Sequence, residues 1–392
     1  MIINADLHIH SPFTKKSEIE SNFKLLSLNA KKKGLDFLAT GDCLQPQWLK
    51  SITNLDPLDE GTFAYEDTLF VLSSEVQTED KVHHLLYFPD VTSLYDFREN
   101  IRKFNVDFTT GRPVIPISSE KLACIAIDAS SLIGPAHIFD SFTGLYSRYE
   151  GLHDCYGSAA SKIFFAELGL GVDTYHADMI KELHHLTFIT NSDTHNPHPI
   201  RLGREFTQFN LKQPRSKYLF EAIKRIGQNK PVLNAGFPPE EGKYYQTGCI
   251  KCQKHYSFKQ AKRRKWKCTC GGFVKKGIKE RILEKSSSSQ YHYPYHRPLY
   301  LSILPLHEII SRALNQKNPF VETVEQCYNH LISVFGNEIH IMLETPIKNI
   351  ENTVDSEVAD IIKVFRMATF DYKKGGGGSY GSLKIDKKSN SS

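Results

Sequence analysis

Histidines and carboxylates spaced two residues apart stand at the start and near the middle of this chain. The chain opens MIINADLHIH, and an extended strand there turns Asp6, His8 and His10 to one face, because successive side chains alternate. Near the middle, the apolar segment ending NSDTH gives Asp193 and His195 the same spacing. Imidazoles and carboxylates that converge at a strand end are typical metal ligands, and bound metal ions lower the pKa of water for hydrolysis. One such pair alone also fits a surface strand that happens to carry histidines.

Several other strand-like segments end in residues of the same kind. Short apolar segments alternate with amphipathic helical stretches such as 23–33, a pattern that predicts a parallel sheet or barrel of the β/α class. In that architecture catalytic residues lie at the C-terminal ends of strands. The ligand-type residues near these ends are Asp42, Glu75, His83, His84, His137 and Glu167. His83 and His84 are adjacent, so only one can face the site. Any one of these residues could be a satisfied core group, but the whole series predicts a metal cluster.

The ordered motifs DLHIHS, TGD, SSEV, HHLL, PAH and SDTH resemble the PHP (polymerase and histidinol phosphatase) superfamily over residues 1–235. The resemblance implies a distorted (β/α)7 barrel that hydrolyses phosphoesters with two or three divalent metal ions (Zn, Mn, Mg or Fe). The ligands it implies are His8, His10, Glu75, His84, His137, Asp193 and His195, of which His8, His10, Glu75, Asp193 and His195 are the expected catalytic residues. His84 is preferred because HLLY matches the family's histidine followed by two apolar residues. His83 and Glu167 are then expected behind the ligands, or Glu167 beside the substrate.

The second PHP motif departs from the usual Thr-Asp-His, because the chain reads Thr40-Gly41-Asp42-Cys43. Either Asp42 replaces the histidine or it is the aspartate displaced by one position. We include Asp42 among the expected metal ligands.

A four-cysteine module follows at residues 236–285. Two close pairs, Cys249/Cys252 and Cys268/Cys270, are spaced for one tetrahedral structural zinc. Residues 243–285 carry 14 Lys and Arg against two Glu, a local charge of +12 within a chain whose net charge is +5. Such a segment favours a polyanionic partner. The residues expected to contact nucleic-acid phosphates, with the tryptophan packing or stacking, are Lys262, Arg263, Arg264, Lys265 and Trp266.

The remaining cysteines are scattered, which favours a reducing compartment over a disulfide framework. The first strand begins at Met1, leaving no room for a signal peptide, and no apolar run approaches the roughly 18 residues of a spanning helix. We therefore expect a cytoplasmic protein without a membrane partner.

Residues 286–370 read as a small α+β domain. We expect helices at 306–314, 320–335 and 356–367, and a strand at 338–343. The aromatic stretch 291–298 fits either an inter-domain loop or a DNA contact. Residues 371–392 are expected to be a Gly-rich linker and disordered tail, although Gly375–Gly378 also fits a loop approaching a ligand.

The order of SDTHNPHPIRLGREF, the cysteine module, HRPLYLSILPLHEII and GGGGSYG resembles the archaeal endonuclease Q family over nearly the whole chain. That resemblance implies a DNA repair endonuclease that nicks on the 5′ side of deaminated bases and abasic sites. Arg201 and Arg204 are candidates to clamp a phosphate, or to form surface salt bridges. Damaged DNA is the expected partner; the replication sliding clamp is a second candidate, without a clear motif.

Three other functions fit parts of the pattern. They are a PHP phosphatase acting on a small phosphomonoester, a polymerase-associated nuclease or proofreading subunit, and a non-catalytic zinc-ribbon adaptor that binds nucleic acid. The ribbon is unnecessary for the first, and the nearly complete ligand set argues against the last.

Overall fold

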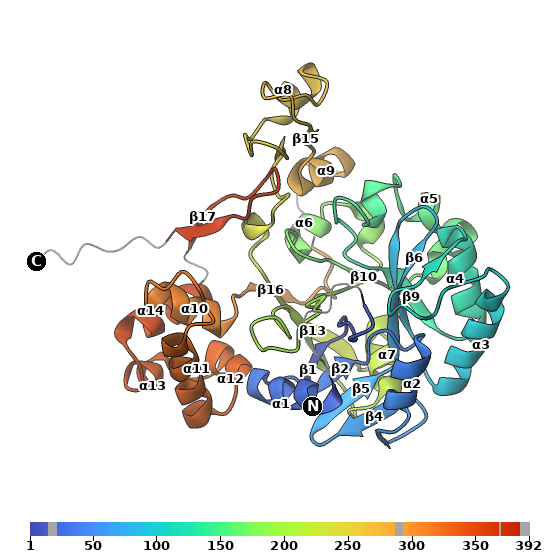
Figure 1. Cartoon of the computed structure of the whole chain (residues 1–392), viewed down its shortest axis with the longest axis horizontal. Helices are drawn as coiled ribbons and strands as arrows, with labels where there is room; N and C mark the ends of the chain where they lie inside the picture. The colour runs from blue at the N-terminus through green and yellow to red at the C-terminus, as the bar shows by residue number, and fades with distance from the viewer. Residues whose placement is uncertain (15–21, 287–292, 368–369, 385–392) are drawn as a thin grey trace, which may run out of the picture.

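The computed structural model describes residues 1–14, 22–286, 293–367 and 370–384. Its centre is a distorted α/β barrel, as the sequence predicts (Figure 1). An eight-stranded sheet forms one side and a four-stranded sheet another, and a two-stranded pair lies beside both. The barrel strands are β1 (Ile2–Asp6), β2 (Phe37–Ala39), β3 (Asp56–Pro57), β4 (Thr62–Tyr65), β5 (Thr68–Val71), β6 (Ser73–Thr78), β7 (His83–Tyr87), β8 (Val114–Ile115), β9 (Leu132–Pro135), β10 (Phe165–Glu167), β11 (Thr187–Ile189), β12 (Phe206–Asn210), β13 (Lys230–Gly236) and β16 (Leu299–Ser302).

Helices cover the outside of these strands. They are α1 (Phe23–Lys33), α2 (Pro46–Ile52), α3 (Val91–Arg102), α4 (Ser119–Asp128), α5 (Leu152–Tyr156), α6 (Thr174–Ala177) and α7 (Ser216–Lys224). The first helix shows how the sequence sets its limits. Asn22 accepts a hydrogen bond from the Leu25 N–H at the start, and Gly34 ends the helix with a φ of +95°. The predicted helix at 23–33 is therefore confirmed.

The strands are not all parallel. β7 runs antiparallel to β6 and β9, and β12 runs antiparallel to β1 and β13. Because β7 is reversed, its first residue lies opposite Gln77 near the end of β6. The start of β7 therefore lies beside the end of β6, and the pairing register decides which residue of β7 faces the site.

A buried apolar cluster is formed by side chains from several barrel strands and from α7. Ile3, Ala5 and Leu7 contribute to it from the first strand and the residues directly after it, and Tyr87 donates a hydrogen bond to the Leu7 carbonyl at 3.0 Å. The alternate residues, Asp6 and His8, belong to the opposite face. The packed face thus fixes the direction of the polar one.

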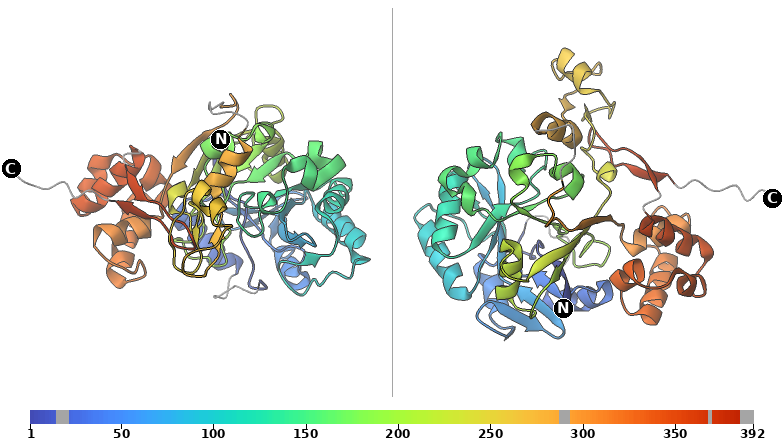
Figure 2. Two further views of the ribbon diagram at one scale, coloured as in Figure 1. Left: turned by 90° about the horizontal axis from the view of Figure 1, so that it is seen from above. Right: turned by 180° about the vertical axis from the view of Figure 1, so that it is seen from behind.

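The four-cysteine module projects from the barrel (Figures 1 and 2). It contains β14 (Gly248–Cys249), α8 (Phe258–Arg263) and β15 (Val274–Lys275), and α9 (Ile278–Lys285) returns from it. Ser257 and Gln260 form a capping box at the start of α8.

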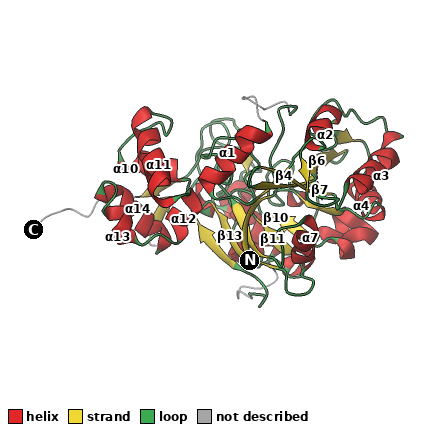
Figure 3. Cartoon of the chain, turned by 90° about the horizontal axis from the view of Figure 1, so that it is seen from below, coloured by secondary structure: helices red, strands yellow, loops and turns green. Residues whose placement is uncertain are grey.

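A separate group of helices packs beside α1 (Figure 3). It consists of α10 (Leu306–Ala313), α11 (Glu322–Phe335), α12 (Glu338–Leu343), α13 (Ile347–Glu351) and α14 (Ser356–Arg366). The predicted strand at 338–343 is wrong. The segment is helix α12, because the Asn337 side chain caps it and Ile339 and Met342 share a buried face at helical spacing.

The predicted linker is also wrong for residues 371–384. β17 (Asp371–Lys373) and β18 (Ser382–Lys384) form a hairpin, and the glycine run between them packs against the cysteine module. A Cβ on Gly377 would lie 2.7 Å from the Cys249 carbonyl oxygen, so this close approach requires glycine. The predicted disordered tail at 385–392 lies outside the described residues, as does the start of the stretch 291–298.

Within the described residues, no helix has the length and apolar character needed to cross a membrane.

Candidate metal centre

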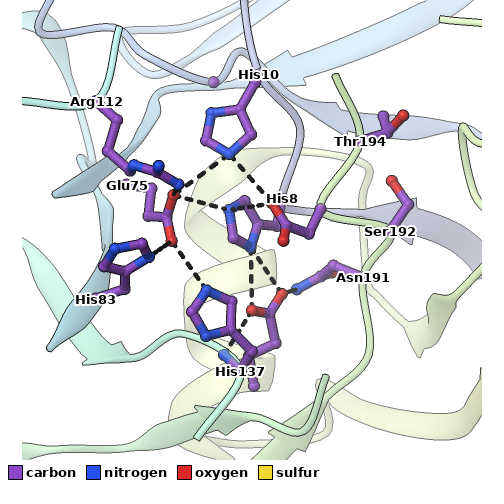
Figure 4. A network of polar contacts seen from close by, with 12 residues as sticks. His8, His10, Glu75, His83, Arg112, His137, Asn191, Ser192 and Thr194 are labelled. Carbon is purple, nitrogen blue, oxygen red and sulfur yellow. Dashed lines mark hydrogen bonds and ion pairs between the residues drawn. The ribbon is translucent and has the colours of Figure 1, made fainter. Parts of the chain in front are cut away.

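Four side chains from three parts of the barrel converge on one point. His8 and His10 follow β1, and His10 is tied to the Asp193 loop because its N–H donates to the Thr194 carbonyl at 2.8 Å. Asp193 Oδ1 lies 3.5 Å from His8 Nε2 and 3.2 Å from His10 Nε2. Glu75 Oε2 from β6 lies 3.8 and 3.3 Å from the same two nitrogens (Figure 4). These four groups can hold one metal ion.

Carboxylates behind the two histidines set the orientation of their rings. His8 donates from Nδ1 to Glu167, 3.0 Å from both oxygens, and His10 donates from Nδ1 to Asp42 at 3.1 Å. With the proton on Nδ1, each Nε2 turns its lone pair toward the cluster. His8 Nε2 is buried and has no hydrogen-bond partner among the described residues. An unpartnered imidazole nitrogen beside two carboxylates is a set of donors that suits a metal cation, so these residues fit a metal site.

Asp42 is placed behind His10, which corrects the prediction that it is a metal ligand. Its Oδ2 accepts hydrogen bonds from the Ser11 N–H, the Ser11 hydroxyl and the Thr14 hydroxyl, each at 2.7 Å, while Oδ1 faces His10. Both oxygens are therefore occupied. In this chain the second motif supplies an aspartate that orients a ligand.

Glu75 also faces a second group of donors. Its Oε1 lies 2.6 Å from His83 Nδ1 and 3.0 Å from His137 Nε2. A carboxylate with one oxygen toward each group can bridge two ions. Burial by itself lowers the pKa of His137, but the hydrogen bond and charge of Glu75 raise it to about 9. The Glu75 carboxylate thus stabilises positive charge at this second group of donors.

The structure reverses the preference for His84 over His83. In the β6–β7 register, His83 pairs with Gln77 and therefore shares the face that carries Glu75. His84 pairs with Val76 on the other face, where Tyr156 and Ser119 are its hydrogen-bond partners at 2.9 and 3.0 Å. Burial lowers the pKa of His84 to about 3, so it is a neutral core residue.

The backbone at this site takes conformations that non-glycine residues rarely adopt. Asp42, His137 and Asp193 have φ values of +48°, +29° and +47°. Left-handed backbone at such residues costs on the order of 1–3 kcal/mol each and is concentrated at functional sites.

His195 lies beside the cluster, with its ring stacked on His10 at a centroid distance of 4.3 Å. It is not among the donors that converge on Glu75.

Two residues at the site carry no recognisable sequence signal. Asn191 donates to Glu167 at 2.8 Å and accepts from the Leu7 N–H at 2.8 Å, which braces the carboxylate behind His8. Arg112 donates to Glu75 Oε2 at 2.9 Å from a loop between α3 and β8. No residue spacing links that loop to the strand ends.

Comparison with solved structures identifies the family. The lesion-specific endonuclease PfuEndoQ from Pyrococcus furiosus is 39% identical to this chain, with a TM-score of 0.94, over 99% of this chain and 96% of that protein. The chain belongs to the endonuclease Q family. A second structure, endonuclease Q bound to a 27-mer duplex with an abasic lesion at its active site, matches at 39% identity and a TM-score of 0.93, covering 99% and 97% of the two chains.

The uncharacterized protein MJ0043 of Methanocaldococcus jannaschii is 39% identical over 255 residues. That match covers 63% of this chain but 31% of the relative, so this chain spans about a third of that longer protein. The model of the MJ0043 C-terminal domain matches residues 305–369, the helical group that follows β16.

The four cysteines of this endonuclease Q family member also converge. Cys249 and Cys270 have their Sγ atoms 3.6 Å apart, Cys252 and Cys268 are 3.5 Å apart, and all four lie within 4.8 Å of one another. The edge of a tetrahedral zinc–thiolate site is about 3.8 Å, given a Zn–S distance of about 2.3 Å. The spacing therefore fits one tetrahedral metal ion.

The basic run predicted to contact phosphates is displayed at the tip of the module. Lys262, Arg263, Arg264 and Lys265 are exposed on α8 and the turn after it. Trp266 is half-buried against the module's small core and meets Phe258 edge-on. The tryptophan therefore packs inside the module and leaves the cations facing outward.

The two arginines predicted to clamp a phosphate lie in the loop after Asp193. Arg204 donates from Nε to the Ser192 carbonyl at 3.0 Å, and the Arg201 side chain is exposed. Neither forms an ion pair with the metal cluster within the described part of the chain.

A third group, His198, His307 and Glu325, also has donors within 4.8 Å of one another. His198 Nδ1 accepts a hydrogen bond from the Ile200 N–H, which leaves the proton on Nε2, the nitrogen nearest Glu325. Because Nδ1 already accepts from the backbone, a metal on Nε2 would leave the ring with no proton at all, as an imidazolate, which is unfavourable. We interpret this group as a contact between the barrel loop and the C-terminal helices.

Proposed function

We propose that this chain is a metal-dependent DNA repair endonuclease. It hydrolyses the phosphodiester on the 5′ side of deaminated bases (uracil, hypoxanthine and xanthine) and of abasic sites. One observation carries the proposal: a buried imidazole–carboxylate cluster occurs in a chain that matches, over nearly its whole length, a structure holding an abasic lesion at its active site.

Two or three divalent ions (Zn, Mn, Mg or Fe) fit the cluster. His8, His10, Glu75 and Asp193 would hold one ion, and Glu75, His83 and His137 would hold another. His195, stacked on His10, remains our candidate to complete the site. Such ions, when bound, lower the pKa of water and stabilise charge on phosphate oxygens.

The protein's own contribution is to hold these groups rigidly in advance. Glu167, itself held by Asn191, fixes the His8 ring, and Asp42 fixes the His10 ring. Because the orienting bonds exist before substrate arrives, little reorganisation is needed during the reaction. Exposure of the site is greatest at Asp193, whose side chain is 39% accessible, so substrate approaches from that side.

The cysteine module would hold one structural zinc and position the DNA. Its exposed cations face outward and suit phosphate contacts, which fix register without reading sequence. In this proposal the metal cluster of the barrel carries out the hydrolysis, and the exposed cations of the module provide non-specific affinity for DNA. Damaged DNA is the partner that uses both.

The proposal is tested by metal-dependent cleavage of a duplex with one abasic site. Asp193→Ala should lower the nicking rate by orders of magnitude while leaving the fold and DNA affinity unchanged, because it removes a metal ligand. Asp96→Ala, on the exposed face of α3, is the matched control and should nick like wild type. Equal rates in all three proteins would overturn the assignment of the cluster.

A further inference from the structure

The loop that carries Arg112 is held on both sides, so its backbone is fixed beside the metal cluster. Gly111 donates its N–H to the Phe13 carbonyl at 3.0 Å, and the Pro113 carbonyl accepts from Gln77 at 3.1 Å. A Cβ on Gly111 would lie 2.4 Å from Asp42 Oδ2, so glycine is needed for the loop to approach the residue that orients His10. The position of Arg112 is therefore built into the site.

The guanidinium meets the cluster at the atom that the metal ligands share. It donates to Glu75 Oε2 at 2.9 Å, and that oxygen also lies 3.3 Å from His10 Nε2. Among the described residues, Arg112 is the one Lys or Arg that forms an ion pair with a carboxylate of the cluster. Figure 4 shows its side chain reaching Glu75 from the side opposite the Asn191 strand end.

Exposure places Arg112 on the open side of the site. Its side chain is 26% accessible and that of Asp193 is 39% accessible, whereas His8, His10 and Glu75 are almost fully buried. A phosphate entering the site therefore meets Arg112 and Asp193 first. A guanidinium has five N–H donors, so donors not used on Glu75 remain for phosphate oxygens.

We propose that Arg112 is a catalytic residue that binds a non-bridging oxygen of the scissile phosphate and stabilises the charge developing there. This inference rests on the proposed nuclease function. Glu75 holds the guanidinium in position through one N–H, and the other N–H groups are the ones that would bind the phosphate. Among the described residues neither Arg201 nor Arg204 forms an ion pair with the cluster, so the role of those two arginines in phosphate binding stays a separate prediction.

The test compares Arg112→Met and Arg112→Lys with wild type on a duplex carrying one abasic site, using the metal-loaded full chain. Arg112→Met should lower kcat by about 10²–10³-fold, in the range seen on removing one donor to a transition-state oxyanion. Arg112→Lys should recover part of the rate, because the charge returns without the two-pronged geometry. Added guanidinium should raise the rate of Arg112→Met but not that of wild type.

Metal content and thermal melting are measured on the same samples. Arg102→Met is the matched control, because Arg102 lies on the exposed face of α3 and its ion pair is with Glu99, which is also exposed. The inference predicts unchanged metal content and melting for Arg112→Met. It is overturned if Arg112→Met nicks within about threefold of wild type, or if its loss of rate is matched by loss of metal, since Arg112 would then merely position Glu75. If wild type itself does not nick, the proposed function fails instead.

Discussion

His83 and His84 are neighbours in the chain but face opposite sides of β7. His83→Ala should remove a metal ligand, lowering both nicking rate and metal content. His84→Ala should leave both unchanged but destabilise the fold by about 1–3 kcal/mol, because Ser119 and Tyr156 lose a buried hydrogen-bond partner. Nicking rate, metal content and urea unfolding of the two variants show which of the two histidines is a metal ligand. Loss of metal in His84→Ala with retention in His83→Ala would restore the assignment made from sequence.

The types of the site residues can be predicted from sequence, but their roles depend on distances. Alternation along one strand suffices to put His8 and His10 on one face. The sequence predicts Asp42 as a ligand, but three hydrogen-bond donors occupy its Oδ2 in the structure. The choice within His83–His84 depends on the register of an antiparallel pair, which a single sequence does not contain.

Glu205 links stability to pH. Burial raises the pKa of its carboxyl to about 8, despite a hydrogen bond from the Phe237 N–H that lowers it. In the unfolded chain the pKa is about 4.3, so between these values only the folded state holds the proton. The free energy of unfolding should therefore fall by about 1.4 kcal/mol per pH unit from this group as pH rises from about 4.5 to 8.

Glu205→Gln, which stays uncharged, should remove that slope. Urea unfolding at pH 5.5 and 7.5 measures it in both proteins. Parallel pH dependence in wild type and variant would mean that the carboxyl is ionised in the folded state.

At the scale of elements, the glycine run at 375–378 attaches the C-terminal hairpin to the cysteine module. Gly377→Ala should cost more than the usual penalty for a left-handed residue, because its Cβ would strike the Cys249 carbonyl oxygen. Gly227→Ala is the matched control, since Gly227 has a similar positive φ and a Cβ added there would meet no described atom within 4 Å beyond its chain neighbours. Thermal melting and protease sensitivity of 371–384 should be affected more by the first change. Equal effects would show that the close approach adds nothing.

Sequence patterns predict the barrel elements well and the C-terminal ones less well. The predicted barrel strands coincide with clear apolar runs of the sequence. At 338–343 the alternation of Ile339, Ile341 and Leu343 fits a strand, but the Asn337 cap and the buried ion pair of Glu338 with Lys33 favour a helix. A glycine run reads as a linker because its neighbours in space lie more than a hundred residues earlier in the chain.

At the scale of the whole molecule, a buried ion pair joins the barrel to the C-terminal helices. Lys33 Nζ donates to Glu338 Oε1 at 2.6 Å and to the Pro199 carbonyl at 3.0 Å, and Glu338 Oε1 also accepts from the Leu306 N–H at 2.9 Å. Pro199 lies in the loop that follows Asp193 and His195. The helices therefore brace the loop that carries part of the site.

Lys33→Met should destabilise the protein by about 3–5 kcal/mol, because Glu338 would keep a buried charge without its partner. Lys31→Met, which breaks an exposed pair with Asp67, is the control and should cost at most about 1 kcal/mol. Urea unfolding compares the two. A cost for Lys33→Met within 1 kcal/mol of the control would mean that the helices are held to the barrel by other contacts.

Mapping of nicks on end-labelled duplexes tests lesion-directed hydrolysis by the barrel cluster most directly. Four duplexes of one sequence carry a uracil, a hypoxanthine, an abasic site or no lesion, and each is incubated with the metal-loaded protein. We expect a nick on the 5′ side of each lesion and none in undamaged DNA, and we expect chelation or Asp193→Ala to abolish it. Release of the free base, nicks spread equally over undamaged DNA, or intact strands in all four duplexes would contradict this expectation.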